Sequence, residues 1–376
     1  MDRNGWAGAP MIYLDYQATT PLALEAFDAM VPLLRDQFAN PHSAHRPGRA
    51  AAAAVEVARD RILAAMGLPA GRLIFTSGAT EALNIAIYGA ARAQSRRRIV
   101  TIATEHAAVR DTVLAQEGFE TILLPVGADG IVDMDAARAA IRSDVALVAA
   151  MLVNNEIGVI QPVDALAALA HDAGALFLCD AVQGFGRVAL PRAADMIAVS
   201  AHKVHGPKGI GALWLRDGLD LPPLLHGGGQ EGGLRSGTLS PALCAGFGVA
   251  AQLLTERGDE DAAHVEALWR RARDLFAGWT LNGSADARYH GNLNLRREGL
   301  DAGRLLSECR DIAFSLGSAC ASGSGRPSHV LQAIALSDGQ AKGSVRIGFG
   351  RYTSTAELED AAGQLNQAAA AQGLPA

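Results

Sequence analysis

The sequence predicts an α/β fold with a mostly parallel central sheet sandwiched by helices, followed by a smaller α/β domain at the carboxyl end. Short apolar runs of strand length alternate with longer, helix-like stretches through the first 250 residues. From about Thr255 the pattern changes to a charged helix and shorter strands. The chain has 376 residues, which is more than one hydrophobic core usually holds, so two domains of unequal size are expected.

The expected elements follow from the period and length of the apolar runs. Strands are predicted at 72–76, 98–102, 121–124, 145–153, 175–179, 196–199 and 212–215. Helices are predicted at 22–38, 47–66, 79–94 and 164–173. After the change of pattern we expect a helix at 259–276, strands at 292–295 and 345–349, and two further helices.

Composition argues against two classes of protein. A net charge of −6 is opposite in sign to a nucleic-acid-binding surface. No run of 18 apolar residues exists, so no membrane span is expected. The first residues lack a basic segment followed by an apolar one, so we expect no signal peptide and a cytoplasmic location.

The segment 200–214 holds two lysines in a Gly/Pro-rich turn between two apolar strands. Lys203 comes directly after the first strand, with Ser200 and His202 just before it. A lysine amine in such a place can form a Schiff base with a carbonyl compound, most often pyridoxal phosphate. The alternative is a surface loop in which Lys203 and Lys208 are both solvated.

An acid and a helix start add to this pattern. Asp180 ends the apolar run 175–179, where a parallel strand meets a ligand crevice, and pyridoxal phosphate needs an anion beside its pyridine nitrogen. Asp180 could instead cap the next segment. Ser77 and Thr80 flank a predicted helix start whose free N–H groups could bind a phosphate. Plain helix capping is the alternative there.

Motifs along nearly the whole chain resemble the cysteine desulfurases of the NifS/IscS type, which are fold-type I pyridoxal phosphate enzymes of the class V aminotransferase superfamily. The resemblance is carried by the runs Asn154-Asn-Glu-Ile-Gly158 and Gly317-Ser-Ala-Cys320 and by segments 13–21, 40–49, 104–106, 227–238, 327–330 and 346–353. It implies the conversion of L-cysteine to L-alanine, with a persulfide formed on Cys320 and passed to an acceptor for iron–sulfur cluster, thio-cofactor or tRNA synthesis.

The resemblance also implies a role for each matching residue. Lys203 would hold the cofactor as a Schiff base, Cys320 would take the sulfur, and His106 would stack on the ring. Asn155 and Arg346 would bind the substrate carboxylate. The implied cofactor-binding residues are Ala79, Thr80, His106, Asn155, Asp180, Gln183, Ser200, His202, Lys203 and Thr238. No metal site is expected.

The four cysteines are predicted to differ in environment. None forms a C-x-x-C pair, which argues against zinc or a redox dithiol. Cys179 ends an apolar strand and should be buried, while Cys244 and Cys309 should pack as small hydrophobic residues. Cys320 lies among small residues in segment 315–326, where a thiol could reach both a substrate and a partner.

The resemblance sets two further expectations, and the sequence departs from its relatives at one position. The large domain would span 15–255, and the small domain would combine 1–14 with 256–376 and carry Cys320. The glycine-rich loop 227–238 would reach the cofactor of a second subunit in a homodimer. Position 187 holds arginine, where relatives usually have lysine.

Two other functions stay open. One is another fold-type I enzyme, such as a selenocysteine lyase or an aminotransferase. The second is a non-catalytic relative. An aminotransferase has no use for Cys320, and a non-catalytic protein has no use for Lys203, Asp180, His106 and Cys320 together.

Overall fold

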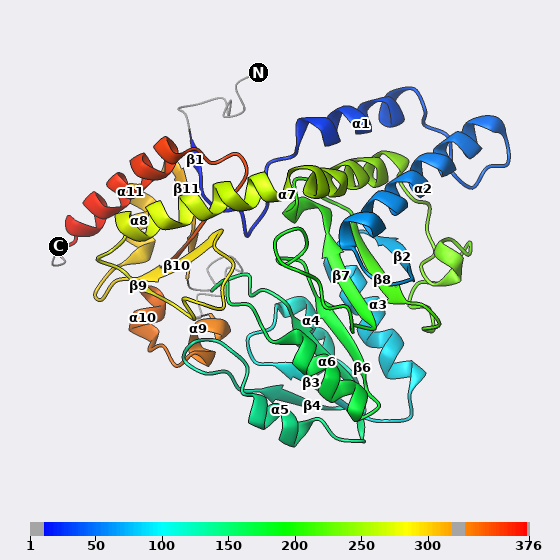
Figure 1. The fold of residues 1–376 in the computed structure, drawn as a ribbon, viewed down its shortest axis with the longest axis horizontal. Helices are drawn as coiled ribbons and strands as arrows, with labels where there is room; N and C mark the ends of the chain where they lie inside the picture. Colours follow the sequence, from blue (N-terminus) through cyan, green and yellow to red (C-terminus); the bar gives the residue numbers. More distant parts are fainter. Residues whose placement is uncertain (1–10, 318–327, 374–376) are drawn as a thin grey trace.

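The computed structural model describes residues 11–317 and 328–373 and is built around a seven-stranded sheet (Figure 1). In spatial order its strands are β2 (Gly71–Thr76), β8 (Gly211–Arg216), β7 (Met196–Ser200), β6 (Leu176–Asp180), β5 (Val145–Met151), β3 (Arg98–Ile102) and β4 (Glu120–Leu124). Only β8 runs antiparallel to its neighbours. The prediction of a mostly parallel central sheet is confirmed.

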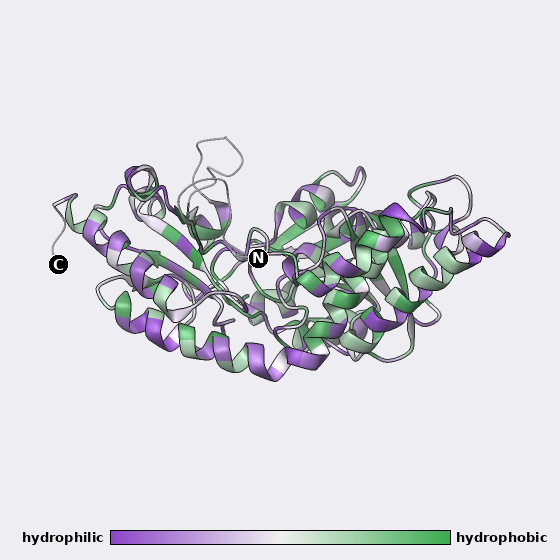
Figure 2. Cartoon of the chain, turned by 90° about the horizontal axis from the view of Figure 1, so that it is seen from above, coloured by the Kyte–Doolittle hydropathy of each residue, from purple (hydrophilic) through white to green (hydrophobic). Residues whose placement is uncertain are grey.

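Helices cover both faces of this sheet. They are α2 (Arg46–Met66), α3 (Ala79–Ala93), α4 (Ala107–Leu114), α5 (Met134–Ala140), α6 (Val163–Asp172) and α7 (Pro241–Leu275), whereas α1 (Leu24–Arg35) packs against α7. Along β5, Val148 and Ala150 pack into a core with α2, α6 and α7, whereas Leu147 and Ala149 pack into a core with α3 and α4. Because both faces of β5 are covered, its sequence is continuously apolar rather than alternating. Figure 2 shows the matching pattern on the outer helices, which are striped with hydrophilic and hydrophobic residues.

A second, antiparallel sheet lies at the other end of the molecule (Figure 1). Its order is β12 (Ser315–Leu316), β13 (Ser344–Gly348), β10 (Asn292–Arg296) and β9 (Thr280–Leu281), and β1 (Ile12–Tyr13) pairs separately with β11 (Ile312–Ala313). The remaining helices are α8 (Ala302–Glu308), α9 (His329–Ala333), α10 (Asp338–Lys342) and α11 (Thr355–Ala370). Leu14 packs with Leu293, Ile347 and Leu358, so the described start of the chain belongs to this core.

Helix α7 joins the two cores. Phe247, near its start, packs under the large sheet, whereas Trp269, near its end, packs with the small sheet. The sequence prediction of a separate helix beginning at 259 was wrong, because α7 is continuous from Pro241. Sequence reasoning missed the first half of the helix because Gly248 disfavours a helix by propensity. A Cβ at this position would lie 2.6 Å from Ala58 Cα, so glycine allows α2 and α7 to touch.

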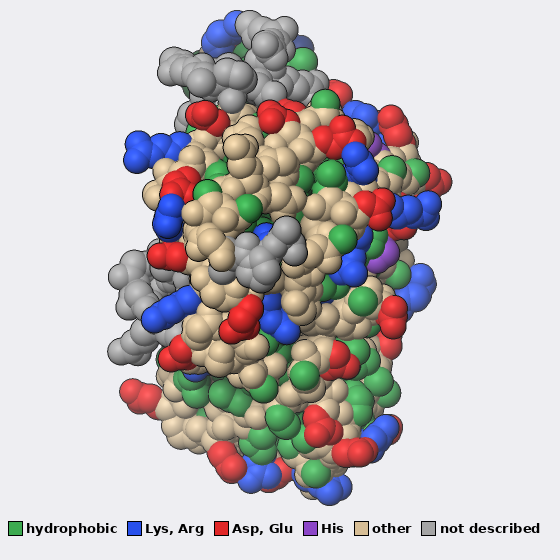
Figure 3. All heavy atoms as spheres, turned by 90° about the vertical axis from the view of Figure 1, so that its left-hand side faces the viewer, with side chains coloured by type: hydrophobic (Ala, Val, Ile, Leu, Met, Phe, Trp, Pro, Cys, Tyr) green, Lys and Arg blue, Asp and Glu red, His purple; other side chains and the backbone are tan. Residues whose placement is uncertain are grey.

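The other predicted elements appear within a few residues of their expected bounds, and the missed ones are short. The division of the chain at residue 255 stays a proposal, because it falls inside α7. Within 11–317 and 328–373, no helix has the length and apolar character needed to cross a membrane. Acidic and basic side chains are interspersed over the described part of the face shown in Figure 3.

Candidate active site

A cavity of about 400 Å³ lies where β5, β6 and β7 end and where α3 and α4 begin. The structure brings most of the predicted site residues together around it. Those that line the cavity are Ala79, Thr80, His106, Asn155, Asp180, Gln183, Ser200, His202 and Lys203. Ser77, which the sequence predicted beside a phosphate-binding helix start, also lines it, as do Lys208 and Met151, to which the sequence gave no binding role.

The start of α3 offers free hydrogen-bond donors to this cavity. The residue before the helix is Gly78, which has no side chain to cap it. The first amides of α3 therefore have no partner within the helix, and they carry the positive end of the helix dipole. A Cβ on Gly211 would lie 2.7 Å from the Gly78 carbonyl carbon, so glycine lets β8 approach this turn. The arrangement suits an anion such as phosphate.

An ion pair ties loop 227–238 to the same helix. Arg235 Nε lies 2.7 Å from Glu81 Oε1, and both side chains are largely buried. Glu81 also accepts a hydrogen bond from the Ser77 amide at 2.5 Å. Thr238, predicted to bind cofactor, is exposed and does not line this cavity.

Asp180 is the last residue of β6 and only 6% exposed. One carboxylate oxygen accepts a hydrogen bond from the Val182 amide at 3.0 Å. Burial raises the pKa of this carboxyl group, and the charges of His106 and Lys203 oppose that rise. The expected strand-end acid is therefore present and buried, and it lines the cavity together with His106 and Lys203.

His106 caps helix α4 and leaves its ring exposed at the cavity. Its Nδ1 accepts a hydrogen bond from the Ala108 amide at 3.0 Å. The neutral ring must then carry its proton on Nε2. This contact fixes both the tautomer and the position of the imidazole.

Lys203 lies in the tight turn that follows β7, and segment 19–23 holds that turn in place. The Thr20 amide donates to the His202 carbonyl at 2.9 Å, and the His205 amide donates to Thr20 Oγ1 at 2.7 Å. His205 has a φ of 66°, a left-handed conformation that non-glycine residues rarely adopt, so these contacts stabilise an unfavourable turn.

Among the residues that the structure describes, the Lys203 amine has no acidic hydrogen-bond partner. Its Nζ donates to the backbone carbonyls of Gln17 and, at 2.9 Å, Ala18. Burial lowers its pKa to about 7, helped by the positive charges of Arg346 and Arg187. A large share of this amine is therefore neutral near pH 7, as a nucleophile requires. Lys208 is exposed at the edge of the cavity.

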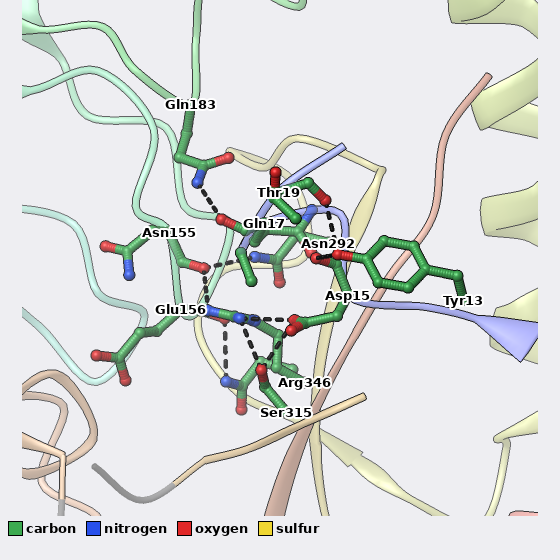
Figure 4. Close-up of polar contacts among 12 residues, drawn as sticks. Tyr13, Asp15, Gln17, Thr19, Asn155, Glu156, Gln183, Asn292, Ser315 and Arg346 are labelled. Atoms are coloured by element: carbon green, nitrogen blue, oxygen red, sulfur yellow. Dashed lines mark hydrogen bonds and ion pairs between the residues drawn. The ribbon is translucent and has the colours of Figure 1, made fainter. Parts of the chain in front are cut away.

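Arg346 lies just behind the cavity wall and was predicted to bind substrate. Figure 4 shows its guanidinium between Asp15, Ser315 and the backbone of Asn155. Its Nη2 lies 2.8 Å from Asp15 Oδ1 and 2.9 Å from Ser315 Oγ, and its Nη1 donates to the Asn155 carbonyl at 3.1 Å. Arg346 itself does not line the cavity, although Asn155 does.

Sequence reasoning gave no role to Asp15 or Gln17. Asp15 pairs with Arg346, and the Gln17 carbonyl accepts hydrogen bonds from both Lys203 and Gln183. One signal was available: Asp15 is charged, yet it lies between Leu14 and Tyr16, which are both buried. An acid in an apolar segment indicates a buried partner.

The described cysteines are buried, and this burial makes their thiols unreactive. Cys179, Cys244 and Cys309 are buried and unpaired, and they pack in the two hydrophobic cores, as predicted. Burial raises the pKa of each thiol, for Cys244 to about 12. Cys320 lies outside the described residues.

Comparison with known proteins shows what the chain is similar to. Residues 12–360 match the family model described as aminotransferase class-V. The chain is 42% identical to a probable mitochondrial cysteine desulfurase of Schizosaccharomyces pombe, over 94% of this chain and 73% of that protein. It is 41% identical to the cysteine desulfurase IscS of Rickettsia bellii, over 93% and 88%. A solved structure of SspA in complex with cysteine is 34% identical and covers 91% of this chain and 99% of its own, with a TM-score of 0.82.

Proposed function

Because the chain belongs to the aminotransferase class-V family and is a cysteine desulfurase, we propose that it takes sulfur from L-cysteine with pyridoxal phosphate held on Lys203. The observation that carries this assignment is the cavity itself. One wall supplies a lysine whose pKa is lowered to about 7, and the same cavity holds the buried carboxylate of Asp180.

The residues around the cavity fit the chemical groups of pyridoxal phosphate. The uncapped start of α3, with Ala79 and Thr80, fits the phosphate, and Ser200 and His202 line the same cavity. Asp180 would pair with the pyridine nitrogen, and His106 would lie against the ring. Gln183 would donate to the ring oxygen. Bound in this way, the cofactor would supply an electron sink for charge that develops at Cα of an amino acid.

Lys203 would act twice in the reaction. Its neutral amine would hold the cofactor, and once released the same amine would accept the Cα proton of the substrate. The backbone carbonyls of Gln17 and Ala18 can hold the ammonium that results.

Cys320 would accept the sulfur. Its thiolate attacks the substrate sulfur, an S–S bond forms, and the Cβ–S bond breaks with its electron pair left on the substrate carbon. That carbon takes up a proton, the Lys203 ammonium returns a proton to Cα, and alanine leaves. The persulfide can then pass its outer sulfur to an acceptor thiol. The buried positions of the three described cysteines support this choice.

Asn155 and Arg346 would hold the substrate carboxylate. Asn155 lines the cavity, and its backbone oxygen accepts from Arg346 at 3.1 Å, so the two residues act as one unit. Arginine can bind a carboxylate with two parallel hydrogen bonds. The SspA structure that resembles this chain was solved with cysteine, which supports the same substrate here.

The active form would be a cytoplasmic two-fold homodimer. Thr238 is exposed on a loop that Arg235 and Glu81 fix beside α3, so it could reach the phosphate site of a second subunit. The described cysteines are unpaired, which suits a reducing compartment. Sedimentation of the active protein should give the mass of a dimer, and a fully active monomer would overturn this part.

The test of the reaction is the stoichiometry of its products. With L-cysteine and a thiol reductant, the loaded protein should release alanine and sulfide in equal amounts. L-alanine, which is the expected product and contains no sulfur, should not be converted to any other compound when it is offered as the substrate. Pyruvate with ammonia in place of alanine, or transfer of the amino group to a keto acid, would point to a different reaction class.

A further inference from the structure

Arg187 connects two residues of the cavity from behind. It lies in the turn after β6 and lines a second cavity of about 490 Å³, which meets the first at Lys203. Its Nη1 donates to Gln183 Oε1 at 2.6 Å and to the Gln183 carbonyl at 3.1 Å. Its Nη2 donates to the Lys203 carbonyl at 2.7 Å. The guanidinium lies over the Tyr289 ring, 5.0 Å from its centroid.

These contacts decide which way the Gln183 amide faces. The two ends of a glutamine amide have nearly the same shape, so hydrogen-bond partners decide the orientation. A guanidinium can only donate, so the end facing Arg187 must be the oxygen. The nitrogen then donates one hydrogen to the Gln17 carbonyl at 2.9 Å and keeps the second for another acceptor. Gln183 is buried and lines the main cavity.

The same contacts close a ring of hydrogen bonds around Lys203. Arg187 binds its carbonyl, Gln183 binds the Gln17 carbonyl, and the Lys203 amine donates to that same Gln17 oxygen. Both the backbone and the amine of Lys203 are therefore placed by a network that passes through Arg187. The guanidinium of Arg187 lies over the aromatic ring of Tyr289, and this contact limits its movement.

We propose that Arg187 is a positioning residue, which holds the Gln183 amide with its N–H side toward the cofactor's ring oxygen and holds the Lys203 turn in register. This inference rests on the proposed function, because it assumes that pyridoxal phosphate occupies the cavity. Arginine suits the task better than lysine, because its planar fork reaches the acceptors on Gln183 and Lys203 together.

The test is the affinity of the apoprotein for pyridoxal phosphate, measured by equilibrium dialysis and by the visible spectrum. Arg187→Met should weaken binding about tenfold, because it removes hydrogen bonds from a charged donor to a buried amide. Arg187→Lys should lose less, since it keeps one donor and the charge. Arg192→Met is the matched control: Arg192 is exposed in the same segment and donates to the Gly67 carbonyl at 3.2 Å, away from Gln183 and Lys203, so affinity should not change.

A double-mutant cycle separates positioning from a general structural effect. If Arg187 acts through Gln183, Arg187→Met should cost less than about threefold when Gln183 is already leucine. The same tenfold loss in both backgrounds would overturn the proposal. Thermal unfolding of each apoprotein identifies any variant that fails to fold, and Arg187→Lys then serves in the same cycle. Absence of cofactor binding in the unmodified protein would refute the proposed function instead.

Discussion

The large and small sheets contribute to the site in different ways. The large sheet presents Asp180 at the end of β6 and Ser200 at the end of β7, so the main chain of buried strands fixes their positions. The small sheet contributes Arg346 from within β13, and its guanidinium is placed by Asp15, Ser315 and the Asn155 backbone. The proposed cofactor end is therefore built into the fold, whereas the proposed substrate end depends on side-chain contacts between distant segments.

The two ends also differ in charge. Lys203 contacts backbone carbonyls and lies near two arginines, so it can lose its proton near pH 7. Arg346 is paired with Asp15 at 2.8 Å and stays charged. A substrate carboxylate must share Arg346 with Asp15. Chemistry is thus expected to fail completely when the large-sheet residues change, and to weaken by degrees when the Arg346 contacts change.

The largest effect should come from Lys203→Ala. It removes the amine that binds the cofactor and moves the proton, so turnover should fall by at least about a thousandfold and the visible cofactor band should disappear. Lys208→Ala is the control, because Lys208 lines the same cavity but is exposed. Absorbance and sulfide release measure both variants. Loss in Lys208→Ala with retention in Lys203→Ala would reverse the assignment.

Cys320→Ser should abolish sulfide release while leaving the cofactor in place. Neither cofactor loading nor substrate binding requires the Cys320 thiol in this account, so L-cysteine should still shift the visible spectrum. Cys309→Ser is the control, since that thiol is buried in the small core. Sulfide production at the normal rate by Cys320→Ser would contradict the proposed sulfur transfer.

Arg346→Gln should act on substrate binding, with a smaller effect than either change above. Losing a charged carboxylate contact should raise KM for L-cysteine about 10- to 100-fold. Asp15→Asn should move KM by less than about tenfold, because Arg346 keeps its contacts with Ser315 and Asn155. Steady-state kinetics separate KM from kcat. An unchanged KM in Arg346→Gln would remove the small sheet from substrate recognition.

The smallest effect is a pH dependence of apoprotein stability. The folded Lys203 has a pKa of about 7, below its unfolded value of about 10.4. Between these values the unfolded chain holds a proton that the folded chain lacks, so the free energy of unfolding should rise with pH across this window. Lys203→Met should flatten the rise. Urea unfolding at several pH values measures it, and an identical slope in the variant would mean that Lys203 is not buried as described.

The sequence predicted the large-sheet end of the site well for a physical reason. A buried parallel strand is a continuous apolar run, so the sequence itself indicates where the strand ends and which polar residue lies at that end. The runs before Asp180 and Lys203 have this form. The small-sheet contacts could not be read in this way. Asp15 and Arg346 are 331 residues apart and meet only because β1 and the small sheet share one core.

Helix α7 shows the same limit in the fold. Its first half contains Gly246 and Gly248, which disfavour a helix by propensity alone. Contact with α2 decides the outcome there, and that contact joins segments about 190 residues apart. Local pattern predicted the elements, whereas the close packing of two elements required the three-dimensional structure.

One measurement tests the central claim most directly: mass spectrometry of the protein after brief incubation with L-cysteine and alkylation of its thiols. The account predicts one additional sulfur on the peptide that carries Cys320, and none on the peptides with Cys179, Cys244 or Cys309. Borohydride reduction of a separate sample without L-cysteine should leave the cofactor's mass on the Lys203 peptide. Additional sulfur on one of the buried cysteines, or a cofactor fixed to Lys208, would contradict the account.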